Sequence, residues 1–98
     1  MKGFGEDPKS NLKSNKSKLN SQELIVNHAI QLHLNGNIPE ATKYYQNCIE
    51  QGIKDCRVFS NYGIILNKLG KLKDAELAYR KAIEINPNYA NAHYNLGN

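Results

Sequence analysis

Apolar residues recur every three or four positions through most of the chain after residue 20, a spacing that gathers them on one face of an α-helix. The clearest stretch covers residues 56–68, and Asp55 precedes it, where a carboxylate can accept hydrogen bonds from the free amides of a first helical turn. Gly70 can adopt a left-handed turn at no steric cost, and a second stretch begins near Leu72. Pro87 cannot donate a backbone hydrogen bond and ends that stretch. The pattern predicts two helices joined by a tight turn.

The preceding part of the chain follows the same plan. Asn20 and Glu23 have the spacing of a capping box, which predicts the start of a helix. Gly36 then predicts a turn, and Pro39 stands in the first turn of the next helix, where proline is tolerated. Gly52 predicts the end of that helix. Two helical hairpins are therefore expected in succession.

Residues 34 positions apart are identical at many places in these hairpins. The shared positions include Gly36 and Gly70, Ala41 and Ala75, Tyr45 and Tyr79, Glu50 and Glu84, Asn27, Asn61 and Asn95, and Gly63 and Gly97. Periods of 22–55, 56–89 and 90–98 align without a gap. Self-similarity at such a period is typical of a stacked repeat protein. The sequence predicts an all-α solenoid of antiparallel helix-turn-helix repeats over residues 21–98, with about two and a quarter units.

The repeat resembles the tetratricopeptide repeat (TPR), a helix-turn-helix unit of 34 residues with small and aromatic residues at fixed places. The second period carries the pattern as Phe59, Tyr62-Gly63, Leu66, Gly70, Ala75, Tyr79, Ala82 and Pro87. This resemblance implies a right-handed superhelix whose first helices line a concave groove. In that family the groove holds an extended peptide or a partner helix.

The groove residues are expected on the face of each first helix that lies opposite its packing stripe. That rule selects nine candidates for peptide binding: Asn27, Ile30, Arg57, Asn61, Ile64, Lys68, Asn91, Tyr94 and Asn95. The same face also includes Glu23, Val26, His33, Ser60, Asn67 and Asn98.

Asparagine stands at the same place in all three periods, as Asn27, Asn61 and Asn95. An amide side chain has a donor and an acceptor, so it can pair with the N–H and C=O groups of a peptide backbone. We refer to these three residues as the asparagine ladder, since they are similar to a ladder in the repeat region of O-linked N-acetylglucosamine transferases. The alternative interpretation is that asparagine serves helix packing here.

The resemblance leaves two further hypotheses open. Members of this family often carry their repeats ahead of a glycosyltransferase, sulfotransferase or methyltransferase domain, so the chain could be the substrate-recruiting part of such an enzyme. Other members hold the C-terminal carboxylate of a chaperone tail with groove lysines and arginines. The comparable places here are Val26, Ile30, Asn91 and Asn95, with agreement only at Asn61. A carboxylate clamp is therefore not expected.

The net charge of +4 is concentrated at one end of the 98-residue chain. Residues 1–20 contain five lysines against two acidic residues, whereas the rest has eight basic and seven acidic residues. The near-neutral repeat region argues against a nucleic-acid surface. The segment 1–20 has few residues to bury and is predicted to be a disordered basic tail. A weaker hypothesis is that this tail binds nucleic acid or anionic lipid.

No pattern of residues predicts catalysis or a cofactor, and the protein is not expected to be an enzyme or to bind a small-molecule substrate. His28 and His33 are five residues apart and do not share a helix face, so no metal site is predicted. No run of apolar residues is long enough for a membrane span, and the two cysteines, Cys48 and Cys56, fit a reducing, cytoplasmic location. A protein or peptide partner is expected. An uncapped C-terminal end is also expected to favour self-association.

Overall fold

A computed structural model of the chain describes the backbone of residues 8–97 and the side chains of residues 21–97. The described chain is helical, with short turns between its elements. The helices are α1 (Pro8–Leu34), α2 (Ile38–Glu50), α3 (Cys56–Lys68), α4 (Leu72–Ile85) and α5 (Ala90–Leu96). The prediction of an all-α fold is confirmed over this part of the chain.

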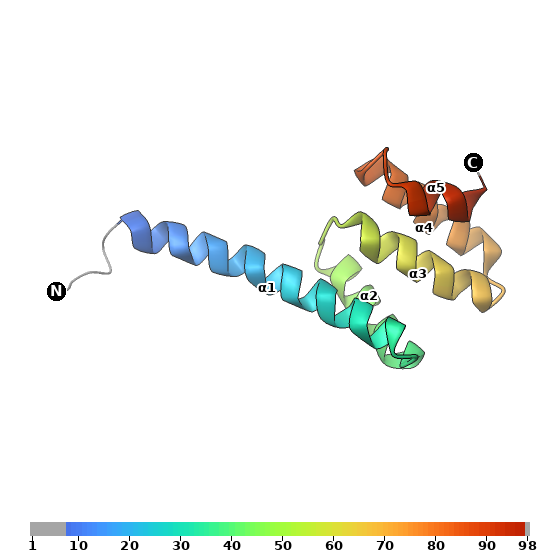
Figure 1. The fold of residues 1–98 in the computed structure, drawn as a ribbon, viewed down its shortest axis with the longest axis horizontal. Helices are drawn as coiled ribbons and strands as arrows, with labels where there is room; N and C mark the ends of the chain where they lie inside the picture. The colour runs from blue at the N-terminus through green and yellow to red at the C-terminus, as the bar shows by residue number, and fades with distance from the viewer. Residues whose placement is uncertain (1–7, 98) are drawn as a thin grey trace.

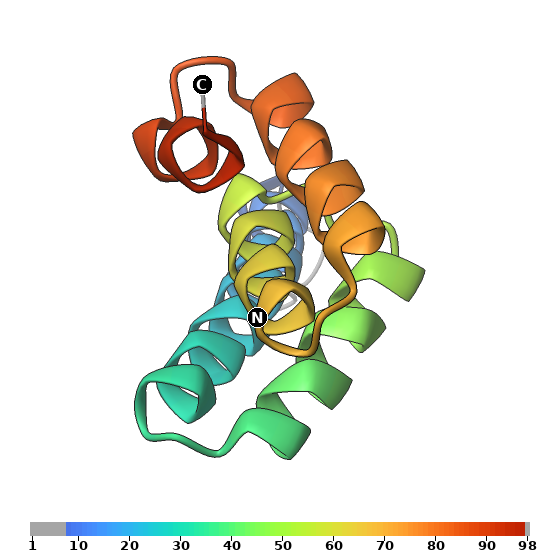
Figure 2. The same cartoon turned by 90° about the vertical axis from the view of Figure 1, so that its right-hand side faces the viewer.

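The helices form two antiparallel hairpins, α1–α2 and α3–α4, with α5 as the first helix of a third unit (Figure 1). Each second helix contacts the first helix of the next unit, and the first helices also contact one another in the order α1, α3 and α5. Figure 2 shows the resulting two layers, with α1, α3 and α5 on one side and α2 and α4 on the other. The predicted array of helical hairpins is therefore observed.

The turns and caps predicted from single residues are present. Gly36 and Gly70 occupy equivalent turns with φ values of 86° and 82°, a conformation that favours glycine. Asp55 caps α3 by accepting a hydrogen bond from the backbone amide of Arg57 at 2.9 Å. Pro39 lies in the first turn of α2, as expected. Local signals therefore predicted the boundaries of α2, α3 and α4 to within a few residues.

The core follows the 34-residue repeat but joins the hairpins together. Its larger cluster combines residues of α1, α2, the turn that follows α2, and α3, namely Val26, Ala29, Ala41, Tyr45, Cys48, Ile53, Val58 and Ile65. A second cluster contains Leu66, Ala75, Ala78 and Tyr79. Because Val58 and Ile65 complete the core of the preceding unit, the first hairpin is stabilised by the second.

Gly63 and Gly97 stand at equivalent places in the repeat, but they have different surroundings. A Cβ atom at Gly63 would lie 2.6 Å from Cε1 of Tyr79, so α3 and α4 approach closely there and the absence of a side chain is required. A Cβ atom at Gly97 would meet nothing within 4 Å, and Gly97 instead ends α5 with φ of 93°. Among the described residues, the close approach seen at Gly63 therefore has no counterpart at Gly97.

The structure differs from the prediction at the N-terminal segment. The predicted disordered tail covers residues 1–20, of which 1–7 lie outside the described residues, but residues 8–20 belong to α1. The helix therefore begins at Pro8, and Asn20 and Glu23 do not cap its start. No glycine or proline interrupts residues 9–35, and extending an existing helix costs far less than nucleating one. In Figure 1 this part of α1 extends away from the other helices.

Candidate peptide-binding groove

The asparagine ladder lies on the three first helices. Asn27 of α1 is exposed, whereas Asn61 of α3 and Asn95 of α5 are half-buried. The three residues therefore stand at equivalent positions of consecutive first helices, and those helices contact one another in sequence. A shared binding surface formed by their amides stays a prediction.

Asn61 has a specific polar environment. The hydroxyl of Tyr45, a fully buried residue of α2, lies 3.1 Å from Nδ1 of His33. Burial raises the pKa of Tyr45 to about 12, and a hydrogen bond from the Asn61 side chain opposes this rise. Burial, followed by the charge of Lys68, lowers the pKa of His33. Tyr45 and His33 therefore form a polar contact between α1 and α2, and Asn61 is a further influence on the pKa of Tyr45.

Arg57 is one of the residues predicted to bind a peptide, but in the structure its guanidinium already binds two carboxylates of the protein. Nη2 donates to Oδ2 of Asp55 at 2.7 Å and to the carboxylate of Glu23 at 3.3 Å, while Nε donates to Oδ1 of Asp55 at 3.0 Å. Burial raises the pKa of Asp55, but the hydrogen bonds and charge of Arg57 outweigh it and hold that pKa below its ordinary value. Arg57 therefore links the first helices of two repeats, and a ligand would have to compete with two carboxylates for it.

The remaining candidates differ in exposure. Ile30 and Ile64 are half-buried and pack against the two core clusters, whereas Lys68, Asn91 and Tyr94 are exposed. Two other residues of the predicted face, Val26 and Ser60, are fully buried, with exposed fractions of 1% and 0%. Packing within the array buries these two positions, which a helical wheel of one helix does not show. Asn98, also predicted on this face, lies outside the described residues.

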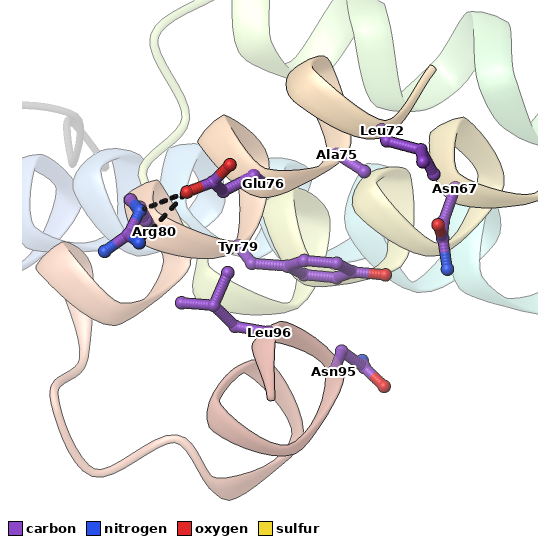
Figure 3. A pocket seen from close by; sticks show the side chains of 8 residues that line it. All are labelled: Asn67, Leu72, Ala75, Glu76, Tyr79, Arg80, Asn95 and Leu96. Carbon is purple, nitrogen blue, oxygen red and sulfur yellow. Dashed lines mark hydrogen bonds and ion pairs between the residues drawn. The ribbon is translucent and has the colours of Figure 1, made fainter. Parts of the chain in front are cut away.

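The structure also contains a hollow that the sequence analysis did not predict. It has a volume of about 360 Å³ and lies between the end of α3, the outer face of α4 and the short α5. Figure 3 shows the side chains that line it, which are Asn67, Leu72, Ala75, Glu76, Tyr79, Arg80, Asn95 and Leu96. Asn95 of the ladder therefore borders a pocket. The 34-residue period could have indicated this hollow. Ala75 and Tyr79 line it, and the equivalent residues one period earlier, Ala41 and Tyr45, are buried in the core cluster that includes residues of α3.

Other kinds of site are not supported by the described residues. Within residues 21–97, no three histidine, cysteine, aspartate or glutamate side chains gather where they could hold a metal ion. Cys48 and Cys56 are both free, the first buried and the second half-buried. None of the described helices has the length and apolar character required to cross a bilayer.

Comparison with known proteins agrees with this geometry. Residues 63–98 match the family model described as TPR repeat. The fold is a TPR helical array. The matched segment includes the end of α3, all of α4 and α5, and the ladder residue Asn95.

Two curated relatives are similar to a larger part of the chain. The Hsp70-Hsp90 organizing protein of Triticum aestivum is 40% identical over 63 residues, which cover 60% of this chain and 10% of that protein. Hsp70-Hsp90 organizing protein 1 of Glycine max is 41% identical over 56 residues, covering 53% of this chain and 9% of that protein. The chain thus spans about a tenth of the length of these relatives. Together with the repeat match, they indicate a protein–protein interaction module.

Proposed function

We propose that this TPR array binds an extended peptide in the groove formed by α1, α3 and α5, and that the asparagine ladder pairs with the peptide backbone. The proposal is supported by the recurrence of asparagine at equivalent positions, Asn27, Asn61 and Asn95, of three first helices that contact one another in sequence. Each amide offers one acceptor and two donor hydrogens, which matches the C=O and N–H groups of an extended chain. Ile30 and Ile64 would add apolar contact beside them.

The names of the relatives suggest chaperones as partners, but the groove lacks the charges that would hold a chaperone tail by its carboxylate. The places that carry lysine or arginine in such grooves are Val26, Ile30, Asn91 and Asn95 here. Arg57 is engaged by Asp55 and Glu23. We therefore propose backbone recognition by amides rather than recognition of a terminal carboxylate. The transferase hypothesis receives no support from these matches.

Substituting all three ladder residues by alanine is expected to abolish peptide capture without loss of helix. Each lost amide pair costs on the order of 1 kcal/mol, so the loss of all three should raise the Kd about a hundredfold or more. The probe is a fluorescent peptide selected from a displayed random library on the unmodified chain, with binding measured by anisotropy and helicity by circular dichroism.

A matched control replaces three exposed asparagines outside the predicted groove face, Asn37, Asn47 and Asn88, by alanine. This control is expected to bind the peptide as well as the unmodified chain does. If the ladder variant also retains full affinity, backbone recognition by these amides is excluded.

Self-association is a second candidate property, favoured by exposed apolar side chains at the turn between α3 and α4. Leu69 and Leu72 are 62% and 63% exposed, and Leu72 borders the hollow beside Tyr79. We expect sedimentation velocity to show a mass that rises with concentration, and Leu72→Glu to abolish this rise because it places a charge on the apolar surface. Leu24→Glu, at an equally exposed leucine of α1, is the control and should leave the association unchanged. A monomer at every concentration would contradict the proposal.

A further inference from the structure

A second hollow lies outside the predicted groove. It has a volume of about 280 Å³ and is formed by the end of α2, one side of α3 and one side of α4. The residues that line it include none of the nine predicted to bind a peptide. Apart from Asp74 and Lys81 of α4, these residues are apolar or aromatic, namely Ile49, Phe59, Tyr62, Leu66, Leu77 and Ala78.

The side of α4 at this hollow is complementary in charge to itself. Asp74, Leu77 and Lys81 are spaced by three and four residues, so they lie along one side of the helix over two turns. The acidic residue is nearer the N-terminus of α4, and the basic residue is nearer the C-terminus. When two such helices lie antiparallel, each Asp74 stands opposite Lys81 of the other copy. A parallel pair would set like charges opposite one another.

The centre of this antiparallel register is apolar. Leu77 is 64% exposed, whereas Ala78 beside it is only 8% exposed. In the antiparallel register, Leu77 of each copy lies opposite Ala78 of the other, and a small residue there lets two helices approach closely. The leucine can then lie against the apolar hollow of the other copy, which removes both surfaces from water.

We propose that a second copy of this chain docks at this hollow, with the two α4 helices antiparallel about a two-fold axis. The charge order of α4 selects this occupant, because the helix supplies both the surface and its complement. The same patch serves on both copies, as a two-fold contact requires. The inference goes beyond the proposed peptide binding and does not depend on it.

The two charged residues are accessible to such a partner. Asp74 is exposed, and within residues 21–97 it takes part in no ion pair. Nζ of Lys81 lies 2.9 Å from Oε1 of Glu84, and their side chains are 43% and 69% exposed. Because exposed ion pairs contribute little to stability, Lys81 can exchange Glu84 for Asp74 of the second copy at little cost.

This contact differs from the surface proposed at Leu69 and Leu72. A two-fold contact closes at two copies, so the rise in mass that Leu72→Glu is expected to abolish is growth beyond this dimer. A contact between two helices is also smaller than a standard interface, which makes the dimer weak and sensitive to its two ion pairs. The ladder residues belong to α1, α3 and α5, which form the other layer in Figure 2, so docking through α4 leaves them free.

The test measures the mass of the 98-residue chain by sedimentation velocity, with Leu72→Glu present in every variant so that only the contact through α4 remains. We expect this parent chain to reach the mass of a dimer and not to exceed it. Asp74→Lys alone and Lys81→Asp alone should each give a monomer, because both ion pairs then become contacts between like charges. Arg80→Asp makes the same kind of charge reversal at the next residue of α4, which lines the other hollow, and should leave the dimer intact.

Mixing the two reversal variants in equal amounts provides the decisive measurement. Each variant alone has like charges at both pairs, but one copy of each restores two pairs of opposite charge. We therefore expect the mixture to form a dimer, and the double variant Asp74→Lys with Lys81→Asp to dimerise with itself.

Three results would overturn the inference: a monomeric parent chain, a dimer that persists in either single reversal, or a mixture that stays monomeric. Circular dichroism reports whether each variant is folded. If a reversal variant loses helix, Leu77→Glu replaces it, and a dimer that persists in Leu77→Glu would count equally against the contact. Peptide affinity is measured separately by anisotropy, so a failure of this dimer is distinguishable from a failure of the ladder to bind peptides.

Discussion

Replacing Tyr45 by alanine is expected to reduce the free energy of unfolding by about 3–5 kcal/mol, the range for truncating a buried aromatic residue. Tyr45 is fully buried in the larger core cluster, where it packs with residues of α1, α2 and α3. The substitution also leaves His33 without its hydroxyl partner. For a domain of this size the midpoint of thermal unfolding should fall by about 12 °C or more, measured by far-ultraviolet circular dichroism.

Tyr94→Ala provides the matched control for this prediction. Tyr94 is the same residue type on α5, but it is 84% exposed and its truncation creates no cavity. The unfolding midpoint of this variant should stay within a few degrees of that of the unmodified chain. Equal losses in the two variants would show that the core described around Tyr45 does not determine the stability of the array.

Gly63→Ala is expected to lower the free energy of unfolding by about 1–3 kcal/mol, the typical cost of overpacking. Alanine is a better helix former than glycine by up to about 1 kcal/mol, so propensity alone predicts stabilisation. The new methyl group would lie 2.6 Å from Cε1 of Tyr79, however, and that ring is only 4% exposed. Because the ring cannot move aside freely, α3 and α4 must separate. Urea unfolding followed by circular dichroism measures the change.

Tyr79→Leu, alone and combined with Gly63→Ala, tests whether the Tyr79 ring causes this loss of stability. Removing the aromatic ring makes room for the methyl group, so Gly63→Ala should be neutral or stabilising in the Tyr79→Leu background. An unchanged cost in that background would mean that the contact between Gly63 and Tyr79 is not its cause.

Much of the fold was predictable because the repeat is encoded by short-range signals. Gly36 and Gly70 mark the turns, Asp55 caps α3, and proline follows α4. Because these signals recur every 34 residues, the sequence predicts that the hairpins stack, even though no contact between them is known. The start of α1 was not predictable in the same way, because a segment rich in lysine, serine and asparagine contains no signal that stops a helix extending from the first repeat.

The groove was predicted less completely than the fold. Periodicity assigned the ladder residues to the first helices, and their role in a groove stays a prediction. The burial of Val26 and Ser60 could not be predicted in this way, because it depends on packing between helices. The engagement of Arg57 required knowledge of two carboxylates, one of them 34 residues away. Such contacts depend on side-chain packing between repeats, which the pattern within one helix does not contain.

The ion pair between Glu23 and Arg57 occurs at only one of the two junctions along the described array. The residue 34 positions after Arg57 is Asn91, which carries no charge. The junction between α3 and α5 therefore has no equivalent ion pair at this position. This junction, next to the hollow at Tyr79, depends on side-chain packing without the ion pair. A long ligand would lie beside an ion pair at the first junction and beside the neutral Asn91 at the second.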